Sequence, residues 1–148
     1  MEFYLFLSSS DGKNMHPNNS YHDFTITLPK MVHLPNMDKH GVEIKWSMAL
    51  CEIYLQLRDA MDKSYNIAVM CDLVEQSYLN SSYAPVIRIF PGETIETASL
   101  FSTYNIQLST NSFSSVRIYL QDLSGLTLPN QFGSTVLSCV LHFQLMLL

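Results

Sequence analysis

Five histidines are the residues of this chain best suited to metal binding or acid–base catalysis. The spacings between the first four are six, eleven and seven residues, which match no ligand pattern such as H-x-H or H-E-x-x-H. The fifth alternates with the apolar face of the last predicted strand, so we expect a hydrogen-bonded strand residue rather than a catalytic base. We therefore predict no metal and no cofactor at these residues: His16, His22, His33, His40 and His142.

Serine and cysteine nucleophiles also lack the surroundings that catalysis needs. No serine lies in a G-x-S-x-G turn, and the five glycines form no phosphate-binding loop. The three cysteines, Cys51, Cys71 and Cys139, lie far apart among apolar neighbours, without a C-x-x-C spacing. This pattern argues against a disulfide framework or a zinc site and predicts buried free thiols in a reducing compartment. We expect a protein that is not an enzyme.

Asp72 is an unusual carboxylate because it follows the apolar residues Val69, Met70 and Cys71. Two interpretations stay open. The side chain lies on the outward face or at the end of a strand, or it has a fixed partner such as Arg88 or a neighbouring subunit. A paired, partly buried carboxylate specifies geometry more than it adds stability.

Length and composition restrict the class of protein. The chain has 148 residues, which is typical of one domain, and we predict a single domain over 1–148. Apolar residues make up 47% and charged residues only 14%, against roughly 25% charged in an average globular domain. Because a small domain has much surface to cover, this shortage of charge predicts that other subunits cover part of it.

The distribution of charge excludes several partners. The net charge is −5 and the eight basic residues are scattered, so we expect neither nucleic-acid binding nor membrane-surface binding. The first residues lack the basic start and cleavage site of a signal peptide. The apolar run at 136–148 has 13 residues, whereas a membrane span needs about 20. We expect a soluble protein without membrane insertion.

Apolar residues alternate with period two through most of the chain, which predicts strands rather than helices. Pro29 is expected to end the second strand, and at most a short helix is expected over 56–63 or 94–100. Turn-forming residues gather between the strands, for example at 8–20, 80–85 and 109–115. The predicted strands cover 3–7, 23–28, 42–50, 67–73, 86–90, 104–108, 116–121 and 137–147.

These strands predict an all-β fold, a single jelly-roll β-sandwich of about eight antiparallel strands. The last strand has the clearest alternation. Its residues Leu137, Leu141 and Phe143 are expected in the core, with His142 on the opposite face.

Three blocks in the same order resemble the penton-type minor capsid proteins of Polinton elements, adintoviruses and related adenovirus-like DNA viruses. The first block covers 16–20, 23–29 and 46–53, the second covers 69–75 and 84–89, and the third runs from 113 to 143. The positions that carry the resemblance are Phe24, Leu28, Pro29, Trp46, Cys71, Asp72, Pro85, Arg88, Gly125, Gly133, His142 and Phe143.

The resemblance implies a single jelly-roll subunit that forms a homopentamer at the five-fold vertices of an icosahedral capsid. The implied partners are double-jelly-roll major capsid subunits and a vertex spike or fibre. The implied location is the virion, after assembly in the cytoplasm or nucleus of the host cell.

This sequence departs from the family in three places. One is a small change on a strand, Ser47-Met48 in place of Glu-Val after the tryptophan. Only residues 54–68 separate two blocks that a long segment usually joins, so a trimmed vertex subunit and a paralogue elsewhere in the shell both fit. The Arg-Gly-Asp loop of adenovirus pentons is absent.

An alternative is a trimeric fibre-head or lectin-like β-sandwich, which would gather polar and aromatic residues on 8–20 and 109–115. A cupin-like enzyme would need histidines on neighbouring strands, which this sequence does not offer.

Overall fold

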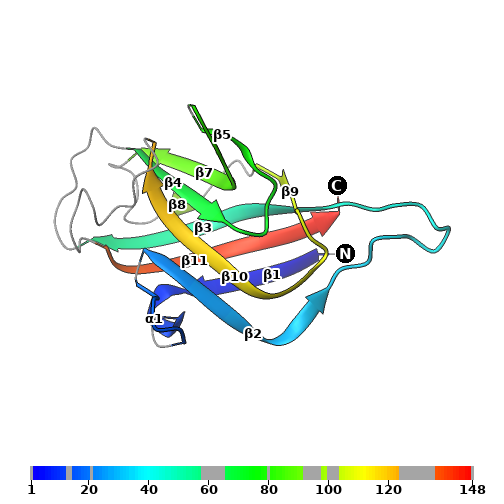
Figure 1. Ribbon diagram of the computed structural model, residues 1–148, viewed down its shortest axis with the longest axis horizontal. Coiled ribbons are helices and arrows are strands. Elements are labelled where there is room, and N and C mark those ends of the chain that lie inside the picture. The colour runs from blue at the N-terminus through cyan, green and yellow to red at the C-terminus, as the bar shows by residue number, and fades with distance from the viewer. Residues whose placement is uncertain are drawn as a thin grey trace.

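The computed structural model shows an all-β chain whose strands pair antiparallel (Figure 1). Among the described residues, the helical content is a single turn, α1 (Ser9–Gly12). The residues that the structure describes are 2–12, 15–20, 22–57, 66–79, 81–91, 98–99, 104–123 and 136–147.

The first sheet has five strands. Its order is β1–β11–β3, and two short strands, β8 and β9, pair at separate points along the far side of β3. The first and last strands of the chain are therefore neighbours. The strands of this sheet are β1 (Glu2–Ser8), β11 (Val136–Leu147), β3 (Trp46–Leu57), β8 (Ala98–Ser99) and β9 (Ile106–Gln107).

The second sheet has four strands in the order β2–β10–β4–β7. A separate two-stranded hairpin, β5–β6, is inserted between β4 and β7 in the sequence. Figure 1 shows the four-stranded sheet in front of the five-stranded one. The strands are β2 (Asp23–His33), β10 (Ser112–Asp122), β4 (Asn66–Cys71), β7 (Val86–Pro91), β5 (Ser77–Leu79) and β6 (Ser82–Ala84).

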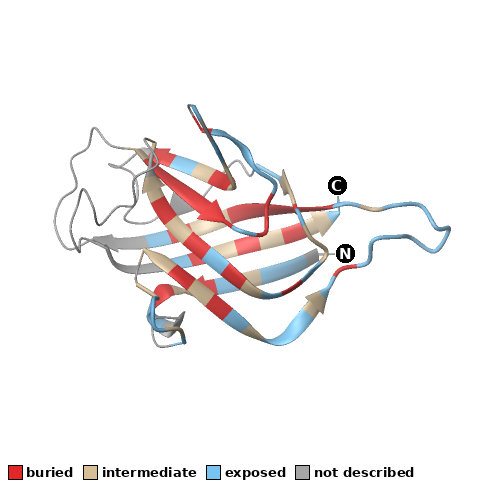
Figure 2. Ribbon diagram, viewed as in Figure 1, coloured by how far each residue is buried: buried red, intermediate tan, exposed pale blue. Residues whose placement is uncertain are grey.

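The main core lies between the two sheets, which makes the fold sandwich-like. Phe24 on β2 pairs with Ile118 on β10, and Leu50 on β3 pairs with Phe143 on β11; all four side chains are buried. Figure 2 shows buried and more exposed residues alternating along β2, β10 and β11. The alternation follows from the strand geometry, in which successive side chains point to opposite faces.

β4 is buried on both faces. Ile67 and Val69 join the main core, while Ala68 and Met70 belong to a second, smaller cluster that includes Leu79 from the hairpin. Strands that are covered on both sides have continuous apolar sequences rather than alternating ones. The apolar run in this part of the chain therefore has a structural explanation.

The predicted facing of the last strand is confirmed from Val140 to Leu145, while Leu147 at its end, predicted on the buried face, is exposed. Leu141, Phe143 and Leu145 are buried, whereas Val140 is exposed and His142 is partly exposed. The side chain of Leu137, also expected in the core, lies outside the described part of the structure.

Pro29 does not end the second strand, so that prediction is wrong: β2 continues to His33. Pairing between β2 and β10 shifts register between Thr27 and Val32, and Pro29 falls inside this irregular stretch. Since β2 is also the outermost strand of its sheet, a proline without an N–H group is tolerated there, at the point where the pairing with β10 is interrupted.

The third strand begins at Trp46, not at residue 42 as predicted. Trp46 pairs with Leu147, the last residue of β11, so the preceding residues have no neighbouring strand to continue the ladder. Instead, Glu43 forms an isolated bridge with Met37 in the loop that projects from the end of the sheets (Figure 1). Val42 in this loop is exposed.

Sequence patterns also missed the short strands. The predicted turn at 80–85 contains β6, and the predicted strand at 104–108 is reduced to the two residues of β9. Of the two segments expected as short helices, 56–57 belong to β3 and 98–99 form β8, while their other residues lie outside the described ranges. Short strands of two or three residues leave too little alternation to recognise.

Within the described ranges, no helix has the length and apolar character needed to cross a lipid bilayer.

Candidate functional site

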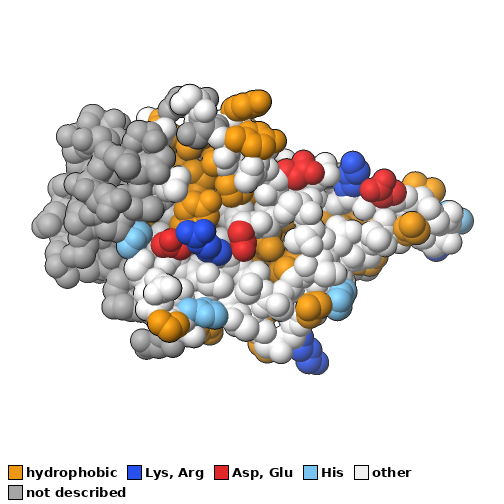
Figure 3. Space-filling model, viewed as in Figure 1, with side chains coloured by type: hydrophobic (Ala, Val, Ile, Leu, Met, Phe, Trp, Pro, Cys, Tyr) orange, Lys and Arg blue, Asp and Glu red, His pale blue; other side chains and the backbone are white. Residues whose placement is uncertain are grey.

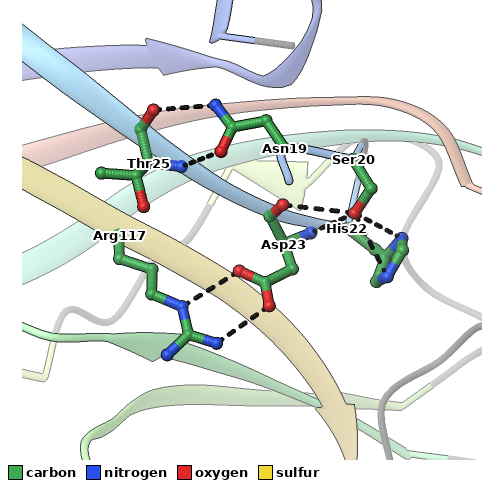
Figure 4. Close-up of polar contacts among 6 residues, drawn as sticks. All are labelled: Asn19, Ser20, His22, Asp23, Thr25 and Arg117. Atoms are coloured by element: carbon green, nitrogen blue, oxygen red, sulfur yellow. Dashed lines mark hydrogen bonds and ion pairs between the residues drawn. The ribbon is translucent and has the colours of Figure 1, made fainter. Parts of the chain in front are cut away.

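An ion pair on the outward face of the four-stranded sheet joins the edge strand β2 to its neighbour β10. Arg117 on β10 donates two hydrogen bonds to Asp23 at the start of β2, from Nε to Oδ1 at 3.0 Å and from Nη2 to Oδ2 at 2.9 Å (Figure 4). This planar, two-bond geometry fixes the direction of both side chains. Hydrogen bonding to Asp23 is also the main cause that raises the pKa of Arg117 above its ordinary value.

The loop before β2 positions Asp23. The Asn19 side chain accepts a hydrogen bond from the Thr25 N–H and donates one to the Thr25 carbonyl, so it continues the edge of β2 (Figure 4). The Ser20 hydroxyl lies 3.1 Å from His22 Nδ1 and accepts a hydrogen bond from the backbone N–H of Asp23. Burial is the main cause that lowers the pKa of His22.

Asp72 directly follows β4 and holds the adjacent part of β10. Its Oδ1 accepts a hydrogen bond from the Arg117 N–H at 2.9 Å, and its own N–H donates to the Arg117 carbonyl. Burial is the main cause that raises the pKa of Asp72, while the hydrogen bond and the charge of Arg117 act in the opposite direction. Both open interpretations therefore hold in part: Asp72 lies at a strand end, and it has a fixed partner.

The sequence suggested Arg88 as a partner for Asp72. In the structure, Arg88 on β7 lies against aromatic rings. Its guanidinium carbon lies 4.3 Å from the centroid of the Tyr104 ring. Arg117 has a similar contact, 4.2 Å from the centroid of Tyr119. Burial is the main cause that raises the pKa of the Tyr119 hydroxyl. We name Asp23, Asp72, Arg117 and Tyr119 the Arg117 cluster.

Figure 3 shows acidic and basic side chains lying side by side on one face of the molecule, with apolar side chains next to them. Three members of the cluster, Asp72, Arg117 and Tyr119, line an open groove. Its wall also includes Glu75, Gln76 and Tyr83. The Tyr83 ring lies 5.2 Å from that of Tyr78, and both rings are exposed on the β5–β6 hairpin. The groove therefore presents carboxylates, an amide and aromatic rings together.

His142 lies on the outer face of the five-stranded sheet among aromatic rings. Its ring is stacked on that of Phe6, with centroids 4.2 Å apart, and lies 5.4 Å from Tyr4. Glu52 Oε2 is 3.5 Å from Nδ1, but neither ring nitrogen has a hydrogen-bond partner among the described residues. The expectation of a hydrogen-bonded strand histidine is therefore wrong: the described contacts of His142 are ring contacts and the nearby Glu52 carboxylate.

The other histidines stay apart from one another. His16 Nε2 is 2.9 Å from Thr27 Oγ1, and His33 Nδ1 is 2.9 Å from Ser112 Oγ. Across the described residues, no three His, Cys, Asp or Glu side chains come together in a way that could hold a metal ion.

Two cysteines are described as free thiols. Cys71 is buried in the main core, and burial raises the pKa of its thiol to about 12. Cys51 is half-buried, so the prediction of a buried thiol is confirmed for Cys71 but not for Cys51. Burial also raises the pKa of Cys51. A thiol with a raised pKa is a poor nucleophile, so neither cysteine has the environment of a catalytic one.

The positions singled out by the family resemblance fall into separate regions. Four of them are buried: Phe24, Trp46, Cys71 and Phe143. Leu28 packs against the main core, and Pro29 is exposed on β2. The Trp46 Nε1–H donates to the Pro35 carbonyl at 2.8 Å, and the Pro85 carbonyl accepts a hydrogen bond from the Cys71 N–H. Gly125 and Gly133 lie outside the described residues. The structure therefore brings Cys71, Asp72 and Pro85 together at the end of β4.

Sequence reasoning missed the centre of the Arg117 cluster. Asp23 and Arg117 are 94 positions apart, and only the pairing of β2 with β10 places them together. A usable signal was present, because each is a charged residue at an outward position of an alternating strand.

No known family model matches this chain, and no curated protein matches it either.

Proposed function

We propose that the chain is a capsid protein, a single jelly-roll subunit of the penton type that forms a homopentamer at the vertices of an icosahedral shell. Its partners are double-jelly-roll major capsid subunits and a vertex spike or fibre, and its location is the virion. The proposal rests on the resemblance of the three ordered sequence blocks and on one structural observation, the pairing of strands described next.

The strands pair as in one long hairpin. With the β5–β6 hairpin set aside and the short β8 and β9 counted as one interrupted strand, eight strands remain. The first pairs with the last (β1 with β11), the second with the seventh (β2 with β10), the third with the sixth (β3 with β8 and β9) and the fourth with the fifth (β4 with β7).

Further pairing rolls this hairpin into two sheets. β11 pairs with β3 and β10 with β4, which gives the orders 1-8-3-6 and 2-7-4-5 over the eight strands. This order supports the jelly-roll proposal, because a jelly roll is an eight-stranded architecture of two sheets, typical of viral capsid and lectin domains. This strand order supports the capsid proposal more directly than any single residue does.

Surface chemistry supports assembly. Only 14% of the chain is charged, and large apolar side chains remain exposed on several strands, among them Phe6, Met31 and Tyr54. The Arg117 cluster has the character of a fixed polar contact that holds β2, β10 and β4 in one geometry. Capsid subunits need such defined geometry because the same contacts repeat around the shell.

Co-assembly tests the proposal. The chain is expressed together with a double-jelly-roll major capsid protein of an adenovirus-like virus, and the particles are purified and imaged. We expect the chain at the five-fold vertices of the particles. A chain that stays out of the particles and is strictly monomeric at high concentration would overturn the proposal.

The alternative is a trimeric fibre-head or lectin-like domain that binds a receptor or glycan. One observation favours it: the groove lined in part by the Arg117 cluster also presents Tyr83, Glu75 and Gln76. Aromatic faces and polar side chains of this kind suit a saccharide. This alternative would need such a cluster on residues 8–20 and 109–115, and of these segments the groove includes Ser109. Binding on a glycan array together with a trimeric mass would favour this function over the capsid proposal.

A further inference from the structure

β1 is an unusually regular and apolar edge strand. Among the described strands its single neighbour is β11, and the pairing runs without interruption from Glu2 to Ser8. Its sequence, Glu-Phe-Tyr-Leu-Phe-Leu-Ser, contains five large apolar residues and no lysine, arginine or proline. A long apolar edge strand is a template for pairing with another chain unless the protein blocks it.

The other sheet edges carry features that block such pairing. The edge strand β2 contains Pro29 and Lys30 together with a register shift, and β7 contains Arg88 and ends at Pro91. β8 and β9 have two residues each. Short length, charge, proline and irregular register are the common protections of an edge. Among the described strands, β1 is the edge that combines length, regular register and the absence of proline and basic residues, and its one charge, Glu2, lies at its first position.

The aromatic side chains of β1 are exposed to solvent, and a ring contact fixes one of them. Phe6 is 70% exposed, Tyr4 is 52% exposed and Phe3 is 40% exposed. Phe6 is stacked on His142 with an angle of 15° between the rings, so it is fixed on the outer face. An aromatic side chain that is already ordered loses little conformational entropy when a partner covers it.

We propose that the β1 edge binds the β1 edge of a second copy, antiparallel, about a two-fold axis at Leu5. In this register Tyr4 lies opposite Phe6 of the second copy and Phe6 lies opposite its Tyr4. Phe3 likewise lies opposite Leu7, and Leu5 opposite itself. Aromatic pairs directly opposite one another stabilise antiparallel strands. Each favourable pair occurs twice, because a two-fold interface uses the same patch on both subunits.

The partner is a second copy because the strand is complementary to itself. All seven residues find a partner in this register, and Glu2 lies opposite Ser8, so no like charges oppose each other. The contact is independent of the proposed pentamer. A five-fold ring joins two different surfaces, whereas this contact joins one surface to its copy, so the two can be lost separately.

Charge exchange on the exposed face tests the pairing. The double variant Tyr4→Lys/Phe6→Lys places lysines opposite lysines, and Tyr4→Glu/Phe6→Glu places carboxylates opposite carboxylates. By sedimentation, we expect the dissociation constant of the two-fold contact to rise by roughly tenfold or more in each variant alone. An equimolar mixture of the two variants should pair again, because each lysine then lies opposite a carboxylate.

The control is Tyr78→Lys/Tyr83→Lys, which makes the same change at an exposed aromatic pair on the β5–β6 hairpin. It should associate as the wild type does. Rescue in the mixture excludes misfolding as the cause of lost pairing.

The proposal is overturned if the wild type shows no two-fold association, or if the lysine variant of β1 associates as strongly as the wild type. A mixture that fails to pair also overturns it. Loss of five-fold rings in that variant would assign β1 to the ring contact and equally overturn the two-fold pairing.

Discussion

Asp72 combines two opposing effects in one side chain. It accepts a hydrogen bond from the Arg117 N–H, which favours the charged form, but burial has the larger effect and raises its pKa. The backbone of β10 is therefore held by a carboxylate at some electrostatic cost. An asparagine at this position retains the acceptor oxygen and removes the charge.

A pH series on Asp72→Asn tests this balance. Because the pKa of Asp72 is raised by folding, the native state binds the proton more tightly than the unfolded state does. The stability of the wild type relative to the variant should therefore fall as pH rises from the ordinary aspartate pKa of about 3.9 through the raised value, and then stay level. Thermal unfolding of both proteins from pH 3 to 7 measures this. A relative stability that rises with pH would contradict it.

The two described thiols should differ in reactivity. Cys71 is buried with a pKa of about 12, so in the native protein at pH 8 we expect iodoacetamide to modify Cys51 and to leave Cys71 unmodified. Peptide mapping after timed labelling measures both rates, and labelling in denaturant, where both react, is the control. Native Cys71 that reacts as fast as Cys51 would contradict its placement in the core.

Strands with long alternation were predictable, and short or irregular ones were not. β1, β10 and β11 correspond to predicted strands because each has enough alternating residues to define a buried face. Pro29 misled the prediction because its tolerance depends on a neighbour: a proline is accepted on an edge strand, and the sequence does not say which strand lies at the edge.

β11 joins β1 to β3 and supplies part of the core, so Leu141→Ala should be costly. Leu141 is fully buried, and truncating a buried leucine typically costs about 2–5 kcal/mol. Val140→Ala is the matched control on the same strand, where the side chain is partly exposed and the expected cost is within about 1 kcal/mol. Denaturant unfolding measures both. Equal costs at the two positions would contradict the facing of the strand.

The candidate site depended on pairings that the sequence does not reveal. The Arg117 cluster draws Asp23 from β2, Arg117 and Tyr119 from β10, and Asp72 from the end of β4. Each residue is unremarkable in its own segment. Only the strand order brings them together, so Asp72 was recognised as unusual from sequence while its partner was not.

At the scale of the whole molecule, the shortage of charge and the rolled order of strands lead to the same proposal. A chain with 14% charged residues leaves apolar side chains at its surface, and a subunit in a shell covers them with its neighbours. The two proposed contacts, a five-fold contact in the ring and a two-fold contact at β1, would cover different parts of this surface.

The native mass of the purified oligomer tests the central proposal most directly. It is measured on the wild type and on Tyr4→Lys/Phe6→Lys, in which the β1 contact is removed. For this variant we predict a discrete species of five times the 16.9 kDa chain mass, with five-fold symmetry in electron micrographs. A monomer or a trimer over the whole range of concentrations, in both proteins, would contradict the proposed vertex subunit.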